Sequence, residues 1–132
     1  MAFDIWITPS NTPTTTNNSY ELMIWLDHGG QYPAGSDTHN SFTDDSGNSY
    51  EIYSTGTGGM GSGNDTWTCL SYVNQGPGIY ADPAFNISSI ISGAVSRFDI
   101  PTTDYIASIE FGNEVLNGSG MTEISNWAIT IK

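Results

Sequence analysis

The chain has 132 residues, the length of one domain with a sizeable core. Its formal net charge is −12, because 14 acidic residues face only 2 basic ones, Arg97 and Lys132. Such a balance allows no basic patch and argues against nucleic acid or an anionic membrane as a partner. Cys69 is the only cysteine, so neither an internal disulfide nor a CxxC metal site can form.

The location of the protein is inferred from composition. Abundant Thr, Ser, Asn and Gly, with 12% aromatic residues and very little Lys, suit an extracellular all-β domain. No apolar run approaches the length of a membrane span. The chain enters a strand-like pattern directly after Met1, so no signal peptide is recognised in it.

The first predicted strand covers residues 3–8 and places Asp4, Trp6 and Thr8 on one face. A polar loop rich in Thr, Asn and Pro follows over residues 9–18. Residues 46–48 indicate a hairpin turn that leads into a strand over residues 49–55. Residues 56–63 hold five glycines and are expected to form a mobile or tightly turning loop.

The most informative stretch is residues 19–30. It alternates cleanly as far as Leu26, where we predict a strand buried on both faces, and it ends in residues 27–30, which suit a turn. Glu21, Met23 and Trp25 share one face, and the other face carries Tyr20, Leu22, Ile24 and Leu26. Glu21 is therefore a carboxylate in mid-strand between a Met and a Trp, a place where an unpaired charge loses much of its solvation. The alternative is a carboxylate at the rim that simply reaches water.

Further strands are predicted over residues 67–74, 105–114 and 123–131. One helix is predicted from an apolar stripe of residues at helical spacing: Ile87, Ile90, Ile91, Ala94, Val95 and Phe98. Its N-cap is either Asp82 with Pro83 at the first position, or Asn86, and Pro101 forces its end. Short strands, glycine-rich turns and one helix together predict a two-sheet sandwich.

The chemistry of the chain centres on Glu21 and Glu114, two strand carboxylates. A pair of carboxyl groups across a cleft is the minimal apparatus for cleaving a glycosidic bond. Trp25 and Trp6 are candidate platforms for sugar rings, although a core or interface residue is the favoured interpretation for each tryptophan individually. No metal site is predicted: the two histidines lack ligand spacing, and residues 44–48 lack the alternating pattern of a calcium loop.

Four segments, residues 20–26 (YELMIWL), 111–114 (FGNE), 118–120 (GSG) and 125–127 (SNW), resemble glycoside hydrolase family 12. That family comprises retaining endo-β-1,4-glucanases with a two-sheet β-jelly-roll and a cellulose-binding cleft. The resemblance implies that Glu21 is the nucleophile, Glu114 the acid/base, Asp4 the aspartate bonded to the nucleophile, and Met23 the methionine beside it. It implies a β-glucan polysaccharide as substrate, and no metal or organic cofactor.

The chain departs from the family pattern in two respects. Val115 follows the acid/base where the family usually has proline, and the family domain has a long portion before the strand of Asp4. Residues 1–132 are therefore expected to be the C-terminal part of a β-jelly-roll domain, without its N-terminal strands. A companion chain or a second copy is expected to cover the open sheet edges. Two rival interpretations are a non-catalytic carbohydrate-binding sandwich and an assembly subunit completed by another chain.

Overall fold

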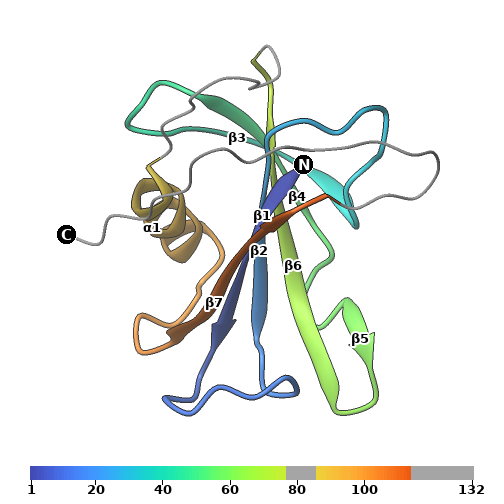
Figure 1. Cartoon of the computed structure of the whole chain (residues 1–132), viewed down its shortest axis with the longest axis vertical. Helices are drawn as coiled ribbons and strands as arrows, with labels where there is room; N and C mark the ends of the chain where they lie inside the picture. Colours follow the sequence, from blue (N-terminus) through green and yellow to red (C-terminus); the bar gives the residue numbers. More distant parts are fainter. Residues whose placement is uncertain (77–85, 114–132) are drawn as a thin grey trace.

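The structure is a computed structural model that describes residues 1–76 and 86–113. Its strands form a seven-stranded sheet in the order β3-β4-β6-β2-β1-β7, with β5 paired to β6 (Figure 1). The elements, in chain order, are β1 (Ala2–Thr8), β2 (Tyr20–Trp25), β3 (Ser36–Thr43), β4 (Ser49–Ser54), β5 (Met60–Ser62), β6 (Asp65–Asn74), α1 (Ile87–Arg97) and β7 (Tyr105–Gly112). The prediction of a mostly β fold with one short helix is confirmed.

Strand β2 lies near the middle of the sheet, as its sequence predicts. It pairs antiparallel with β1 on one side and parallel with β6 on the other, so neither edge of β2 is left unpaired. Leu22 and Ile24 are fully buried on one face, and Glu21 and Trp25 are buried on the other. The prediction of a strand buried on both faces is confirmed.

The core lies on the face that α1 covers. Side chains of β1, β2, β4 and β6 meet Ile90 and Ala94 of the helix there. The members of this core that are fully buried on the sheet are Ile5, Leu22, Ile24, Tyr50, Ile52, Leu70 and Tyr72. Figure 1 shows α1 packed beside the sheet, which leaves the other face of the strands for the polar and aromatic residues of the site.

Helix α1 begins after Asn86, whose side chain accepts a hydrogen bond from the Ser89 backbone N–H at 3.1 Å. This confirms Asn86 as a cap, the second of the two predicted starts; the first, Asp82 and Pro83, lies outside the described residues. The helix ends at Arg97, and the Phe98 N–H bonds to the Ala94 carbonyl at 2.9 Å.

Two strands were not predicted. β3 is an edge strand with mostly exposed polar residues, so its side chains carry no apolar alternation. β5 lies inside the glycine-rich segment expected to be a loop, and that expectation is wrong for Met60–Ser62, which pair with β6. Backbone pairing needs no apolar side chain, and Gly61 adopts a φ of 79° that favours glycine. The predicted closing strand, residues 123–131, lies outside the described residues.

Candidate active site

The face of the sheet opposite α1 gathers the residues singled out in the sequence. Cross-strand register pairs Trp6 with Glu21 and Asp4 with Met23, and it pairs Glu21 with Cys69 on the other side. Since side chains alternate along each strand, Asp4, Trp6, Glu21, Met23 and Trp25 all project from this one face. Asp4 and Glu21 are diagonal neighbours on adjacent strands, a separation that long side chains span.

Glu21 is 9% exposed and accepts a hydrogen bond at its Oε2 from the Trp67 indole Nε1 at 2.7 Å. A buried carboxylate needs such a donor, because it has lost most of its contact with water. The bond to the charged oxygen favours the ionised form of the acid. This strand therefore carries a carboxylate held in one place by a defined partner, rather than the rim carboxylate of the alternative interpretation.

Cys69 faces Glu21 across the parallel pair and is fully buried. Burial, followed by the negative charge of Glu21 and with a smaller effect from Asp4, raises the pKa of the Cys69 thiol to about 12. The thiol is consequently neutral at ordinary pH and is no nucleophile. Since both carboxylates act on this thiol, Asp4 and Glu21 both lie near the buried Cys69 side chain.

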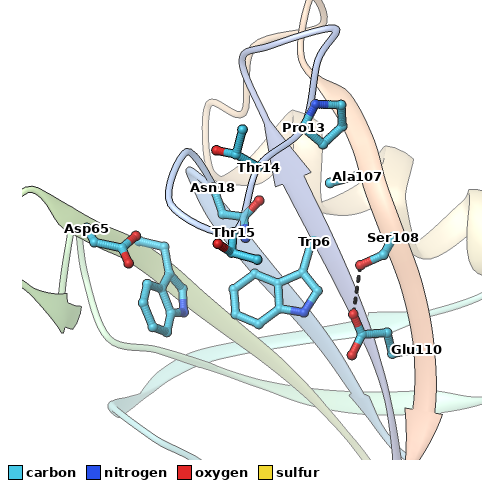
Figure 2. Close-up of a pocket in the computed structure, with 10 residues that line it drawn as sticks. Trp6, Pro13, Thr14, Thr15, Asn18, Asp65, Ala107, Ser108 and Glu110 are labelled. Carbon is cyan, nitrogen blue, oxygen red and sulfur yellow. Dashed lines mark hydrogen bonds between the residues drawn. The ribbon is translucent and has the colours of Figure 1, made fainter.

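A cavity of about 550 Å³ opens beside this group. Its lining combines indole rings with small polar side chains and two carboxylates, from Trp6, Pro13, Thr14, Thr15, Asn18, Asp65, Trp67, Ala107, Ser108 and Glu110. Figure 2 shows the Trp6 ring between Asp65 on one side and Ser108 with Glu110 on the other. The rings of Trp6 and Trp67 meet edge to face, with their centroids 5.4 Å apart.

Glu21 does not line this cavity, but Trp67 connects the two. Trp67 lines the cavity, and its Nε1 donates to Glu21. On the other side of the cavity, the Ser108 hydroxyl donates to Glu110 at 2.9 Å. The arrangement is an aromatic and acceptor-rich hollow next to a buried carboxylate, which suits a ligand with many hydroxyl groups and apolar ring faces.

The sequence-predicted residues differ in their surroundings. Trp6 lines the cavity, whereas Trp25 is 5% exposed and donates from its Nε1 to the Met23 sulfur at 3.5 Å. Trp25 and Met23 thus form a packed pair beside Glu21, so Trp25 as a sugar platform stays a prediction. Glu114, the predicted acid/base, lies outside the described residues.

Sequence reasoning missed three residues of this region: Trp67, Asp65 and Glu110. The alternation of β6 places Trp67 on the same face as Cys69, and that was visible in the sequence. The missing information was that β6 runs parallel to β2 with Cys69 opposite Glu21, a pairing between segments far apart in the chain. Within the described ranges, no three potential metal ligands come together, and no helix has the length and apolar character of a membrane span.

Comparison with known proteins identifies the family. The chain belongs to glycosyl hydrolase family 12, whose model matches residues 1–132. It is 29% identical over 133 residues to "Endoglucanase S" of Pectobacterium parmentieri, a match that covers 99% of this chain and 48% of that protein. The predicted resemblance to this family is confirmed.

Solved structures agree with the fold. A family 12 xyloglucanase from Bacillus licheniformis, solved with a ligand, superposes with a TM-score of 0.74 at 25% identity, covering 87% of this chain and 48% of that one. An endoglucanase from Rhodothermus marinus superposes with a TM-score of 0.64 at 24% identity over 82% of this chain and 44% of that one, a likeness of fold. The expected β-jelly-roll class of family 12 is confirmed.

The chain spans about half the length of these relatives, since it covers 48% of the first two. None of the comparisons supports the companion chain expected from the sequence.

Proposed function

We propose that this chain carries the catalytic face of a retaining endo-β-1,4-glucanase that cleaves β-glucan outside the cell. One observation carries the proposal: a buried glutamate in the middle of the sheet, hydrogen-bonded by an indole N–H, next to a cavity lined by tryptophan. Membership of family 12 supports the same reaction class.

The proposed reaction is a double displacement. The Glu21 carboxylate attacks the anomeric carbon and forms a glycosyl-enzyme ester, while Glu114 gives its proton to the departing glycosidic oxygen. Glu114 then takes a proton from water, which attacks the same carbon and releases Glu21 as a carboxylate. Asp4 is proposed to orient Glu21 from the diagonal position on β1.

The proposed substrate is a chain of β-1,4-linked glucose. Indole faces stack on the apolar faces of pyranose rings, and hydroxyl groups of the sugar bond to carboxylates and small polar side chains. Trp6 offers such a face in the cavity, and Trp25 and Met23 are proposed to border the sugar nearest Glu21. The relatives include one described as a xyloglucanase and one named an endoglucanase, and these names support a β-glucan substrate.

The decisive experiment measures release of reducing ends from hydroxyethylcellulose by the purified chain. Glu21→Gln is nearly isosteric, so it should keep the fold and reduce turnover by roughly three orders of magnitude or more, because the amide cannot attack. Glu51→Gln is the matched control. Glu51 projects from the same face but is exposed and does not line the cavity, so its loss should change turnover less than twofold.

Stereochemistry distinguishes the proposed mechanism from inversion. Proton NMR of the first product should show the β-anomer, and the Glu21 and Glu114 carboxyl groups should lie about 5–5.5 Å apart. An α-anomer as the first product would refute the covalent role of Glu21. Binding of cello-oligosaccharides without any hydrolysis would identify the rival, a carbohydrate-binding sandwich.

A further inference from the structure

The hydrogen bond between Trp67 and Glu21 is short for an indole donor. Its length of 2.7 Å lies at the short end of the N–H···O range and within the range of bonds to charged acceptors. The indole N–H can only donate, so Glu21 Oε2 must be the acceptor. The bond joins β6 to β2 on the face of the proposed site, and it defines the position of one of the two carboxyl oxygens.

The Trp67 ring is itself held from two directions. The Trp6 ring meets it at an interplanar angle of 68°, and Met60 of β5 is its cross-strand partner. Gly61 closes the remaining space: a Cβ at this residue would lie 2.7 Å from Cζ3 of Trp67 and would also collide with the Asp65 carbonyl. Only glycine lets β5 lie this close to the indole.

The glycine-rich segment and Thr55, which precedes it, are hydrogen-bonded to β6 next to Trp67. The Gly58 N–H donates to the Thr68 hydroxyl at 3.2 Å, and the Thr55 hydroxyl accepts the Cys69 N–H at 3.0 Å. The segment therefore packs along the strand that carries Trp67.

We propose that Trp67 is a positioning residue for the nucleophile, and that β5 exists to hold its indole against Glu21. The indole N–H selects one rotamer of Glu21 and stabilises its carboxylate, the form that attacks the sugar. This inference rests on the proposed function only in calling Glu21 the nucleophile; the positioning itself is a property of the free protein.

The positioning role of Trp67 predicts in which direction the pH dependence of activity changes when the N–H is lost. A donor to the carboxylate favours the ionised form, so without it Glu21 takes up its proton at a higher pH. The acidic limb of the kcat/KM profile reports the group that must be ionised in the free enzyme. Loss of the N–H should therefore move this limb to higher pH. A purely structural role of the ring would leave the limb where it is.

The test removes the N–H alone. 3-Benzothienylalanine is introduced at position 67 by stop-codon suppression. It keeps the bicyclic shape of tryptophan but has sulfur in place of the N–H group. The measurement is the titration of the Glu21 side-chain carboxyl by ¹³C NMR, assigned with Glu21→Gln. We expect the midpoint to rise by about one pH unit, the scale of a hydrogen bond to a charged group. The same replacement of Trp25, whose N–H meets the Met23 sulfur, is the control and should leave the midpoint in place.

A second pair of variants tests β5. Gly61→Ala keeps the N–H but forces the hairpin off the indole, so the midpoint should rise as well. Gly63→Ala introduces similar backbone strain, at a φ of 64°, with nothing within 4 Å of the new methyl group, and should cause no shift.

An unchanged Glu21 midpoint after the replacement at position 67 would overturn the inference, whatever the activity. A raised midpoint in a chain that hydrolyses no glucan would confirm the positioning and refute the proposed function. A raised midpoint together with a shifted acidic limb would confirm both.

Discussion

The Cys69 thiol shows how burial beside carboxylates controls the chemistry of a single residue. Burial and the nearby charge of Glu21 raise its pKa from the ordinary 9.0 to about 12. We expect no reaction with a thiol reagent such as Ellman's reagent at pH 8 in the folded protein, because neither the thiolate nor access is present. Complete reaction should follow unfolding in guanidinium. Fast labelling of the folded chain would contradict the buried position.

The same pKa predicts the alkaline limit of stability. A raised pKa in the folded state means that the folded protein holds its proton more tightly than the unfolded one. The stabilisation is complete below about pH 9, the ordinary value of the thiol, and is lost as the pH rises to about 12. Tyr50 contributes with the same sign, because burial and the charge of Asp44 raise the pKa of its hydroxyl. Urea unfolding at pH 8 and pH 10.5 should show the decrease, and Cys69→Ala should make it smaller.

At the scale of residues, sequence reasoning found Glu21 but not its partner. The alternation of β2 is local, so a carboxylate between Met23 and Trp25 can be recognised from neighbouring positions alone. The Trp67 contact depends on the register between β2 and β6, which are distant in the sequence. Glu21 and Trp67 are 46 residues apart in the chain. Alternation gives the face of a residue, but not its neighbour on another strand.

Among the elements, the start of α1 offers a direct measure of local stability. Asn86 caps the helix by accepting the Ser89 N–H, and its amide also donates to Asp45 at 3.2 Å. Asn86→Ala should lower the free energy of unfolding by about 1 kcal/mol, as for other lost caps. Ser92→Ala, an exposed change in mid-helix, is the control and should change it by less than about 0.5 kcal/mol. Equal effects of the two variants would contradict the capping role.

The contact between Gly93 of α1 and Phe42 of β3 decides whether Gly93→Ala raises or lowers the free energy of unfolding. Alanine favours a helix over glycine by about 1 kcal/mol, but a Cβ at Gly93 would lie 2.5 Å from Cε2 of Phe42. Overpacking costs about 1–3 kcal/mol, and Phe42 is also held by the Arg97 guanidinium, 5.1 Å above its ring. We therefore expect Gly93→Ala to destabilise the protein in urea unfolding.

Phe42→Leu provides the control for this contact. It removes the ring edge that the new methyl group meets, so Gly93→Ala in that background should become neutral or stabilising. If Gly93→Ala is stabilising on its own, the helix does not press on the Phe42 ring as closely as the structure shows.

The elements that sequence reasoning missed share one property. β3 carries exposed polar side chains and β5 carries glycine and serine, so both are strands because of the backbone pairs that they form with β4 and β6. Strands with an apolar face, such as β1 and β2, were predicted with nearly correct bounds. Hydrophobic alternation indicates which face of a strand is buried. It cannot reveal a strand such as β3 or β5 that buries few side chains.

At the scale of the whole molecule, charge is the dominant feature. The net charge is −12, and the face of the proposed site carries Asp4, Glu21, Glu51 and Glu110. Arg97, the basic residue of the described part, lies over Phe42 on the helix side. A substrate that approaches this face therefore meets a negative potential, which salt weakens.

This charge predicts a difference between two soluble substrates. Carboxymethylcellulose carries negative groups, whereas hydroxyethylcellulose is neutral. As sodium chloride rises from about 0.01 to about 0.2 M, the Debye length falls from about 30 Å to below 10 Å, and repulsion over the sheet face is screened. We expect kcat/KM for carboxymethylcellulose to rise several-fold over this range, while that for hydroxyethylcellulose stays nearly constant. Glu110→Gln removes one charge at the cavity and should reduce the salt dependence for the anionic substrate. The same salt response for both polymers would show that charge on this face does not govern the approach of the glucan.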